Sequence, residues 1–124
     1  MQTTRTVLVV EDDETLRFLA TKQLKWLGFE CETAVNGSDA VNKTEARNYD
    51  MIFMDVQMPV MDGLEATQFI REKELSDKRN SYTPIIAMTA MAERQKCFDA
   101  GMNDYIFKPV TVDQLKKMLE RWTP

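Results

Sequence analysis

The 124-residue sequence contains no histidine, only two cysteines, and four residues each of glycine and proline. Without histidine the chain has no imidazole base, no histidine-containing zinc site and no phosphohistidine of its own. Cys31 and Cys97 are far apart in the sequence, and the chain shows no export signal, so we expect two free thiols; a disulfide between them is the alternative. These absences exclude several classes of enzyme and metalloprotein.

The chain also lacks a basic excess and a long apolar run. It carries 16 Lys and Arg against 20 Asp and Glu, a net charge of -4, so we expect no nucleic-acid partner. The longest uncharged stretch, residues 80–92, is about two thirds of the ~20 residues that a membrane span needs. The first residues do not have the pattern of a signal peptide. We therefore expect a cytoplasmic protein with no transmembrane helix.

Length and composition predict a single domain that covers residues 1–124. An apolar content of 44% in a chain of this size suffices for one buried core, and no repeat or flexible linker interrupts it. No residues remain for a second domain, so any output function must belong to another domain or protein.

Hydrophobic patterns predict an α/β fold with a doubly wound, five-stranded parallel sheet and five helices. Four apolar runs without polar alternation indicate strands that are buried on both faces: residues 6–10, 51–54, 85–88 and 105–107. Residues 31–35 form a weaker second strand. Helical periodicity with stop or capping signals predicts five helices, and the three middle ones cover residues 38–48, 64–75 and 92–100. The first helix has its apolar stripe at Leu16, Ala20, Leu24 and Leu27. The last begins with Thr111 and Gln114 at capping-box spacing and has its apolar stripe at Leu115, Met118, Leu119 and Trp122.

Residues 71–79 contain seven charged side chains in nine positions. Such a run is typical of a solvated helix end and its exit loop, so we expect these side chains to face water.

The residues whose side chains can take part in chemistry lie at the ends of the predicted strands. In an open parallel sheet, the functional crevice lies beyond the carboxyl ends of the strands. The residues that follow or close the predicted strands are acidic, hydroxyl-bearing or cationic: Glu11, Asp12 and Asp13 after the first, Asp55 after the third, Thr89 after the fourth and Lys108 after the fifth. Three of these carboxylates (Glu11, Asp12 and Asp55), the hydroxyl and the ammonium are therefore expected to share one pocket.

Bringing Glu11, Asp12 and Asp55 together creates like-charge repulsion, which is expected to raise the pKa of one carboxyl. An oxygen-rich site of this kind suits Mg²⁺, which binds one or two carboxylates and keeps several waters. The alternative is that Asp12 and Asp13 only cap the following helix; we expect Asp13 to do so in either case.

Asp55 has the position expected of a nucleophile, because it stands at the end of a rigid strand. An ionised carboxylate can attack phosphorus to form an aspartyl phosphate without a general base. Lys108 would neutralise the incoming anion and Thr89 would donate its hydroxyl to a phosphoryl oxygen. Taken alone, Lys108 could also be a surface lysine, and the following Pro109 allows a cis peptide bond.

Four sequence blocks in register resemble the signature of response-regulator receiver domains: residues 9–13 (VVEDD), 54–63 (MDVQMPVMDG), 88–90 (MTA) and 107–109 (FKP). The block 54–63, together with residues 101–105, is most similar to receivers of hybrid histidine kinases. The resemblance covers the whole chain and implies a flavodoxin-like fold with strand order 2-1-3-4-5. A stand-alone regulator and an excised receiver are both left open; Met1 favours a true or engineered start.

The resemblance also implies a role for each matching residue. Asp55 is the expected phosphoacceptor, with Thr89 and Lys108 binding the phosphoryl group. The expected Mg²⁺ ligands are Asp12, Asp55, the backbone carbonyl of Gln57 and, through water, Glu11; Asp13 is not one. Tyr105 corresponds to the aromatic switch, with a core aromatic as the alternative, and Gln57 and Met91 correspond to positions that tune hydrolysis.

The implied function is that of a phosphoacceptor in a two-component or phosphorelay system. The expected phosphodonor is a histidine kinase or histidine phosphotransfer protein, and the expected target binds the surface of the fourth helix, fifth strand and fifth helix. We expect no enzyme activity beyond self-phosphorylation and autodephosphorylation, and a monomer or weak dimer. Two alternatives are a Mg²⁺-dependent phosphohydrolase, disfavoured because Gln57 replaces its second carboxylate, and a phosphate-independent interaction module.

Overall fold

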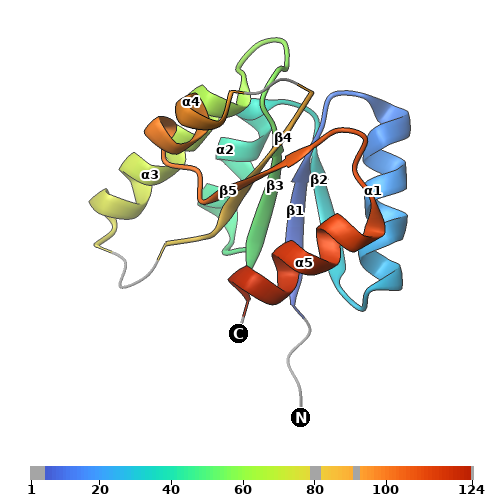
Figure 1. Ribbon diagram of the computed structural model, residues 1–124. Helices are drawn as coiled ribbons and strands as arrows, with labels where there is room; N and C mark the ends of the chain where they lie inside the picture. The colour runs from blue at the N-terminus through green and yellow to red at the C-terminus, as the bar shows by residue number, and fades with distance from the viewer. Residues whose placement is uncertain (1–4, 79–81, 91–92, 124) are drawn as a thin grey trace.

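In the computed structural model, which describes residues 5–78, 82–90 and 93–123, five parallel strands alternate with five helices (Figure 1). The elements are β1 (Thr6–Val10), α1 (Glu14–Trp26), β2 (Glu30–Ala34), α2 (Gly37–Ala46), β3 (Met51–Asp55), α3 (Gly63–Ser76), β4 (Ile85–Thr89), α4 (Arg94–Ala100), β5 (Asp104–Phe107) and α5 (Val112–Trp122). The strand order is β2-β1-β3-β4-β5, all parallel. Both the doubly wound architecture and the strand order are confirmed.

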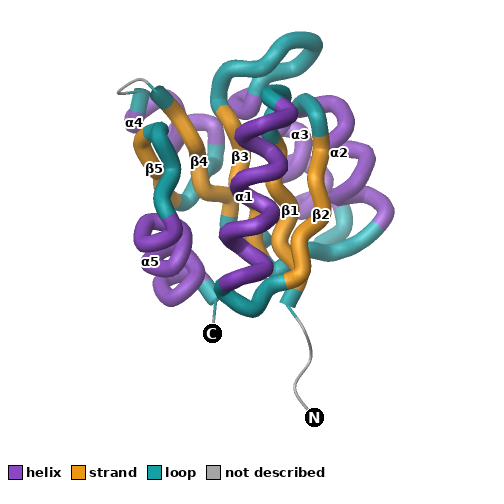
Figure 2. Tube along the Cα trace, turned by 90° about the vertical axis from the view of Figure 1, so that its right-hand side faces the viewer, coloured by secondary structure: helices purple, strands orange, loops and turns teal. Residues whose placement is uncertain are grey.

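The sheet is buried between two layers of helices, as its apolar strands require. In β1, Val7 and Val9 belong to one core cluster while Leu8 and Val10 belong to the other, because successive side chains point to opposite faces. Helices α1 and α5 cover the first face, and α2, α3 and α4 cover the second (Figure 2). Every residue of β1, β3 and β4 is buried.

Side-chain caps fix where four of the helices begin. The oxygens of Asp13, Asn36, Asp62 and Thr111 each accept a hydrogen bond from the backbone N–H three residues later. The predicted capping box at Thr111 and Gln114 is confirmed. Helix α4 begins at Arg94, after a residue whose side chain makes no cap hydrogen bond; the predicted start at Ala92 lies outside the described residues.

Some predicted boundaries and faces differ from the structure. Strand β2 is shifted by one residue to Glu30–Ala34, and α2 ends at Ala46 because Arg47 has an extended backbone, with φ of -158°. Leu16 was expected on the buried stripe of α1 but is 41% exposed; it lies in the first turn of the helix and lines an apolar hollow. The two cysteines are free thiols, as expected; Cys97 is buried and Cys31 half-buried.

The prediction that residues 71–79 face water is wrong for Arg71 and Glu74. Glu74 is 1% exposed, and its carboxylate pairs with Arg71 at 2.7 Å and accepts from the Thr83 N–H at 2.8 Å. Arg71 also donates to the Gly101 carbonyl and to the Asn103 side chain. The two residues lie one turn apart on the inner side of α3, where their charges satisfy each other.

No described helix is both long and apolar enough to cross a membrane.

Candidate functional site

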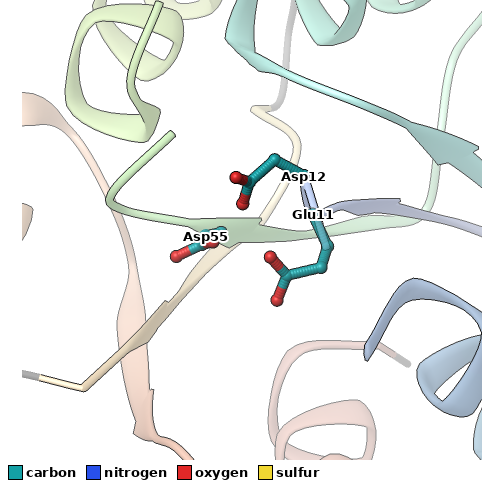
Figure 3. Close-up of side chains that lie close together, drawn as sticks. All are labelled: Glu11, Asp12 and Asp55. Carbon is teal, nitrogen blue, oxygen red and sulfur yellow. The ribbon is translucent and has the colours of Figure 1, made fainter. Parts of the chain in front are cut away.

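Three carboxylates meet where β1 and β3 end. Asp55 is the last residue of β3, and Glu11 and Asp12 follow β1 directly. One oxygen from each carboxylate lies within 4.8 Å of the others, and Figure 3 shows the three side chains around a common space. Glu11 and Asp55 are buried, whereas Asp12 is exposed. The predicted convergence of these acids is confirmed.

Lys108 is the cation that the acids face. Its Nζ lies 3.0 Å from Glu11 Oε1 and 3.1 Å from Asp55 Oδ2, so it bridges the two buried carboxylates. Lys108 follows β5 and joins Pro109 through a cis peptide bond. These ion pairs exclude the alternative in which Lys108 is only a surface lysine.

The electrostatics of the site favour a further cation. Burial raises the pKa of Glu11 to about 7, with a hydrogen bond to Asp55 adding to the rise and Lys108 opposing it. Burial alone would lower the pKa of Lys108, but its pairing with Glu11 and Asp55 raises it. Three acids against one ammonium leave an excess of negative charge, and carboxylate oxygens at this spacing suit Mg²⁺.

Thr89 and Gln57 lie at the same end of the sheet. Thr89 is the buried last residue of β4, and its carbonyl accepts from the Lys108 N–H at 2.8 Å. The Gln57 N–H donates to Asp55 Oδ1 at 3.3 Å, which holds the start of the β3–α3 loop against the phosphoacceptor candidate. Met91 lies outside the described residues.

The β3–α3 loop packs closely against Asp55. A Cβ on Gly63 would lie 2.2 Å from the Asp55 carbonyl oxygen, so the close approach requires glycine. The Gly63 N–H donates to the Val56 carbonyl at 2.9 Å. Within the loop, Val60 has a left-handed backbone, with φ of 73°, and the flanking Met61 N–H donates to the Pro59 carbonyl.

Arg17 is a site residue that the sequence interpretation missed. Its guanidinium donates to the backbone carbonyls of Glu11 at 2.9 Å and Asp12 at 3.4 Å, fixing the turn that presents both acids. The only signal available was its position in the first turns of the helix after the acids. Asp13 caps α1 through the Leu16 N–H at 2.9 Å, as predicted.

Tyr105 lies on β5 and is half-buried. Its ring packs against the core cluster beneath α2, α3 and α4, and also makes edge contacts with Phe98 and Phe107. The ring thus borders both the core and the surface.

An apolar hollow of about 360 Å³ opens beside the acids. Leu16, Leu19, Pro109 and Val110 line it, and both Glu11 and Lys108 reach it.

Residues 7–120 match the response regulator receiver domain model. The chain belongs to the receiver domain family. It is 43% identical over 123 residues to hybrid signal transduction histidine kinase G of Dictyostelium discoideum, covering 95% of this chain and 4% of that protein. It is 40% identical over 118 residues to sensor protein EvgS of Escherichia coli K12, covering 93% of this chain and 9% of that protein. The chain thus spans a small part of these curated relatives.

Solved receiver domains share its fold. The receiver domain of sensor histidine kinase PA1611 from Pseudomonas aeruginosa PAO1, which has a magnesium ion coordinated in its active site cleft, superposes with a TM-score of 0.85 at 36% identity, covering 97% of this chain and 98% of that one. The receiver domain of Ssk1 from Saccharomyces cerevisiae, solved with the histidine phosphotransfer protein Ypd1, gives a TM-score of 0.89 at 32% identity, covering 97% and 89%. The chain is a receiver domain of the two-component and phosphorelay type.

Proposed function

We propose that this receiver accepts a phosphoryl group on Asp55 in a Mg²⁺-dependent reaction. The observation that carries the proposal is the bridging of buried Asp55 and Glu11 by Lys108 in a space that exposed Asp12 also borders. Oxygen ligands, a nucleophilic carboxylate and a mobile ammonium are the groups that phosphoryl transfer to a carboxylate needs.

Asp12, Asp55, the Gln57 backbone carbonyl and, through water, Glu11 would hold the metal. The carboxylate oxygens fit this assignment because they lie within 4.8 Å of one another. When bound, Mg²⁺ would neutralise charge on the phosphoryl oxygens.

The chain's own residues perform the transfer. A carboxylate oxygen of Asp55 attacks phosphorus, the bond from phosphorus to the donor breaks, and the leaving group departs with that electron pair. Lys108, already 3.1 Å from the Asp55 carboxylate, moves its hydrogen bonds to the new phosphoryl oxygens. Thr89 donates its hydroxyl to the same group and moves inward, which lets Tyr105 turn toward the core.

The donor is a protein that carries a phosphohistidine. The related Ssk1 receiver was solved with the histidine phosphotransfer protein Ypd1. We expect the donor to contact the apolar hollow beside the site, where Leu16 and Leu19 are 41% and 48% exposed.

The downstream target binds the surface of α4, β5 and α5, where Phe98 and Phe107 are partly exposed next to Tyr105. The chain turns over no external substrate; its chemistry is its own phosphorylation and dephosphorylation.

Acetyl phosphate with Mg²⁺ tests the proposal by intact mass spectrometry. We expect the parent to gain one phosphoryl group, labile to hydroxylamine, and Asp55→Asn to gain none. Asp13→Asn is the matched control, because asparagine preserves the helix cap and Asp13 is not a ligand. Chelation of Mg²⁺ should abolish labelling of the parent. Equal labelling of Asp55→Asn, or rapid hydrolysis of unrelated phosphomonoesters without an adduct, contradicts the proposal.

A further inference from the structure

Three side chains enclose the ring of Tyr105. The Cζ atom of Arg94 lies 5.1 Å from the ring centroid, in a cation–π contact. Phe107 and Phe98 approach edge-on, with centroid separations of 5.2 and 6.3 Å. The phenol is therefore held by a cation as well as by two aromatic rings.

These neighbours come from two adjacent elements. Arg94 and Phe98 lie one turn apart on α4, and Phe107 lies two residues after Tyr105 on β5; Figure 1 shows α4 beside β5. Arg94 is exposed, and Phe98 and Phe107 are 39% and 43% exposed. The side chains that make these contacts are thus exposed or partly exposed, whereas the Tyr105 ring also packs against the core cluster.

A guanidinium near an aromatic ring is attracted by the ring's π electrons. At an exposed site the contact favours the bound arrangement by roughly two- to five-fold. Turning Tyr105 away from Arg94 would break this contact, so Arg94 would oppose a movement in that direction.

We propose that Arg94 is a positioning residue that holds Tyr105 on the surface side and so limits how often the unphosphorylated domain adopts its signalling form. The inference rests on the proposed function, in which Tyr105 turns inward after phosphorylation. A contact that stabilises only the surface arrangement shifts the two-state equilibrium by its own differential energy.

Fluorine NMR of protein labelled with 3-fluorotyrosine tests this directly. The chain has three tyrosines, and Tyr105→Phe assigns the resonance of interest. Arg94→Met keeps the stem length and removes the charge; we expect the Tyr105 resonance to move toward its phosphorylated position, with the inward population rising roughly two- to five-fold. Arg94→Lys should give a smaller shift. The rate of phosphorylation by acetyl phosphate should rise in parallel.

Lys96→Ala is the matched control, since Lys96 is an exposed cation on the same helix whose ion pair is with Glu93. It should leave the Tyr105 resonance and the rate unchanged. An unmoved resonance in Arg94→Met, an equal shift in Lys96→Ala, or a shift without a change in rate overturns the proposal. Failure of the parent to take a phosphoryl group refutes the proposed function instead; the Tyr105 resonance of Arg94→Met, compared with those of the parent and Lys96→Ala, then still reports whether Arg94 contacts the ring.

Discussion

Replacing Arg71 with methionine should destabilise the domain severely, because it leaves the carboxylate of Glu74 buried without its cation. Arg71 Nη1 lies 2.7 Å from Glu74 Oε1, and Glu74 is 1% exposed. At an effective dielectric of about 20, the direct attraction at this distance is about 6 kcal/mol before desolvation is subtracted. Breaking a buried pair of this kind costs about 3–5 kcal/mol.

Other contacts place Arg71→Met in the upper part of that range. The guanidinium also donates to the carbonyls of Thr83 and Gly101 and to the Asn103 side chain, linking α3 to the segments before β4 and β5. A hydrogen bond from a charged donor contributes about 1.5–3 kcal/mol. Because domains of this size have about 5–15 kcal/mol of stability, the variant is expected to be marginally folded.

Urea denaturation of a double-mutant cycle provides the measurement. Arg71→Met, Glu74→Met and the double variant are compared with the parent by their free energies of unfolding. The double variant should lose about 2 kcal/mol less than the two single losses combined, because it contains no unpaired buried charge. Additive losses, or a loss below about 1 kcal/mol for Arg71→Met, refute this explanation of the network.

Three further predictions concern Asp104, Gly63 and Val60. Burial alone would raise the pKa of Asp104, but hydrogen bonds from Trp122 and other donors lower it, so the Asp104 carboxylate stabilises the fold above about pH 4 and this stabilisation is lost as the pH falls through the lower, folded-state pKa. Asp104→Asn should therefore reduce the dependence of the unfolding free energy on pH in the acid range; an unchanged pH dependence contradicts this. Gly63→Ala should destabilise the domain by about 1–3 kcal/mol and slow its phosphorylation, because the added methyl group displaces the loop beside Asp55. A urea midpoint and a phosphorylation rate equal to those of the parent would contradict this prediction. Val60→Gly should raise thermal stability by about 0.5–1 kcal/mol by removing left-handed strain; a lower melting temperature refutes it.

The sequence was sufficient to predict the sheet and the acids at its edge. Buried parallel strands have a strong apolar signature, and their carboxyl ends converge by geometry, so Glu11, Asp55 and Lys108 could be placed together before any coordinates. Strand β2 was less certain because its polar residues, which lie at the sheet edge, give a weak signal.

Contacts between distant side chains could not be predicted in this way. Arg71 donates a hydrogen bond to Asn103, 32 residues away in the sequence, and Glu74 accepts one from the Thr83 N–H, nine residues away. The charged run at the end of the helix therefore gave no sign of its buried ion pair. The packing of Arg94 over Tyr105 depends in the same way on how α4 rests against β5. Periodicity reports which face is apolar, whereas such pairs depend on tertiary geometry.

The most direct test of the account is to locate the phosphoryl group itself. After reaction with acetyl phosphate and Mg²⁺, borohydride reduction of the acyl phosphate followed by peptide mapping should place the modification on Asp55 alone. Modification of Glu11 or Asp12 in its place, or an unmodified chain under conditions in which a known receiver is labelled, would contradict the claim that these acids and Lys108 form a phosphoacceptor site.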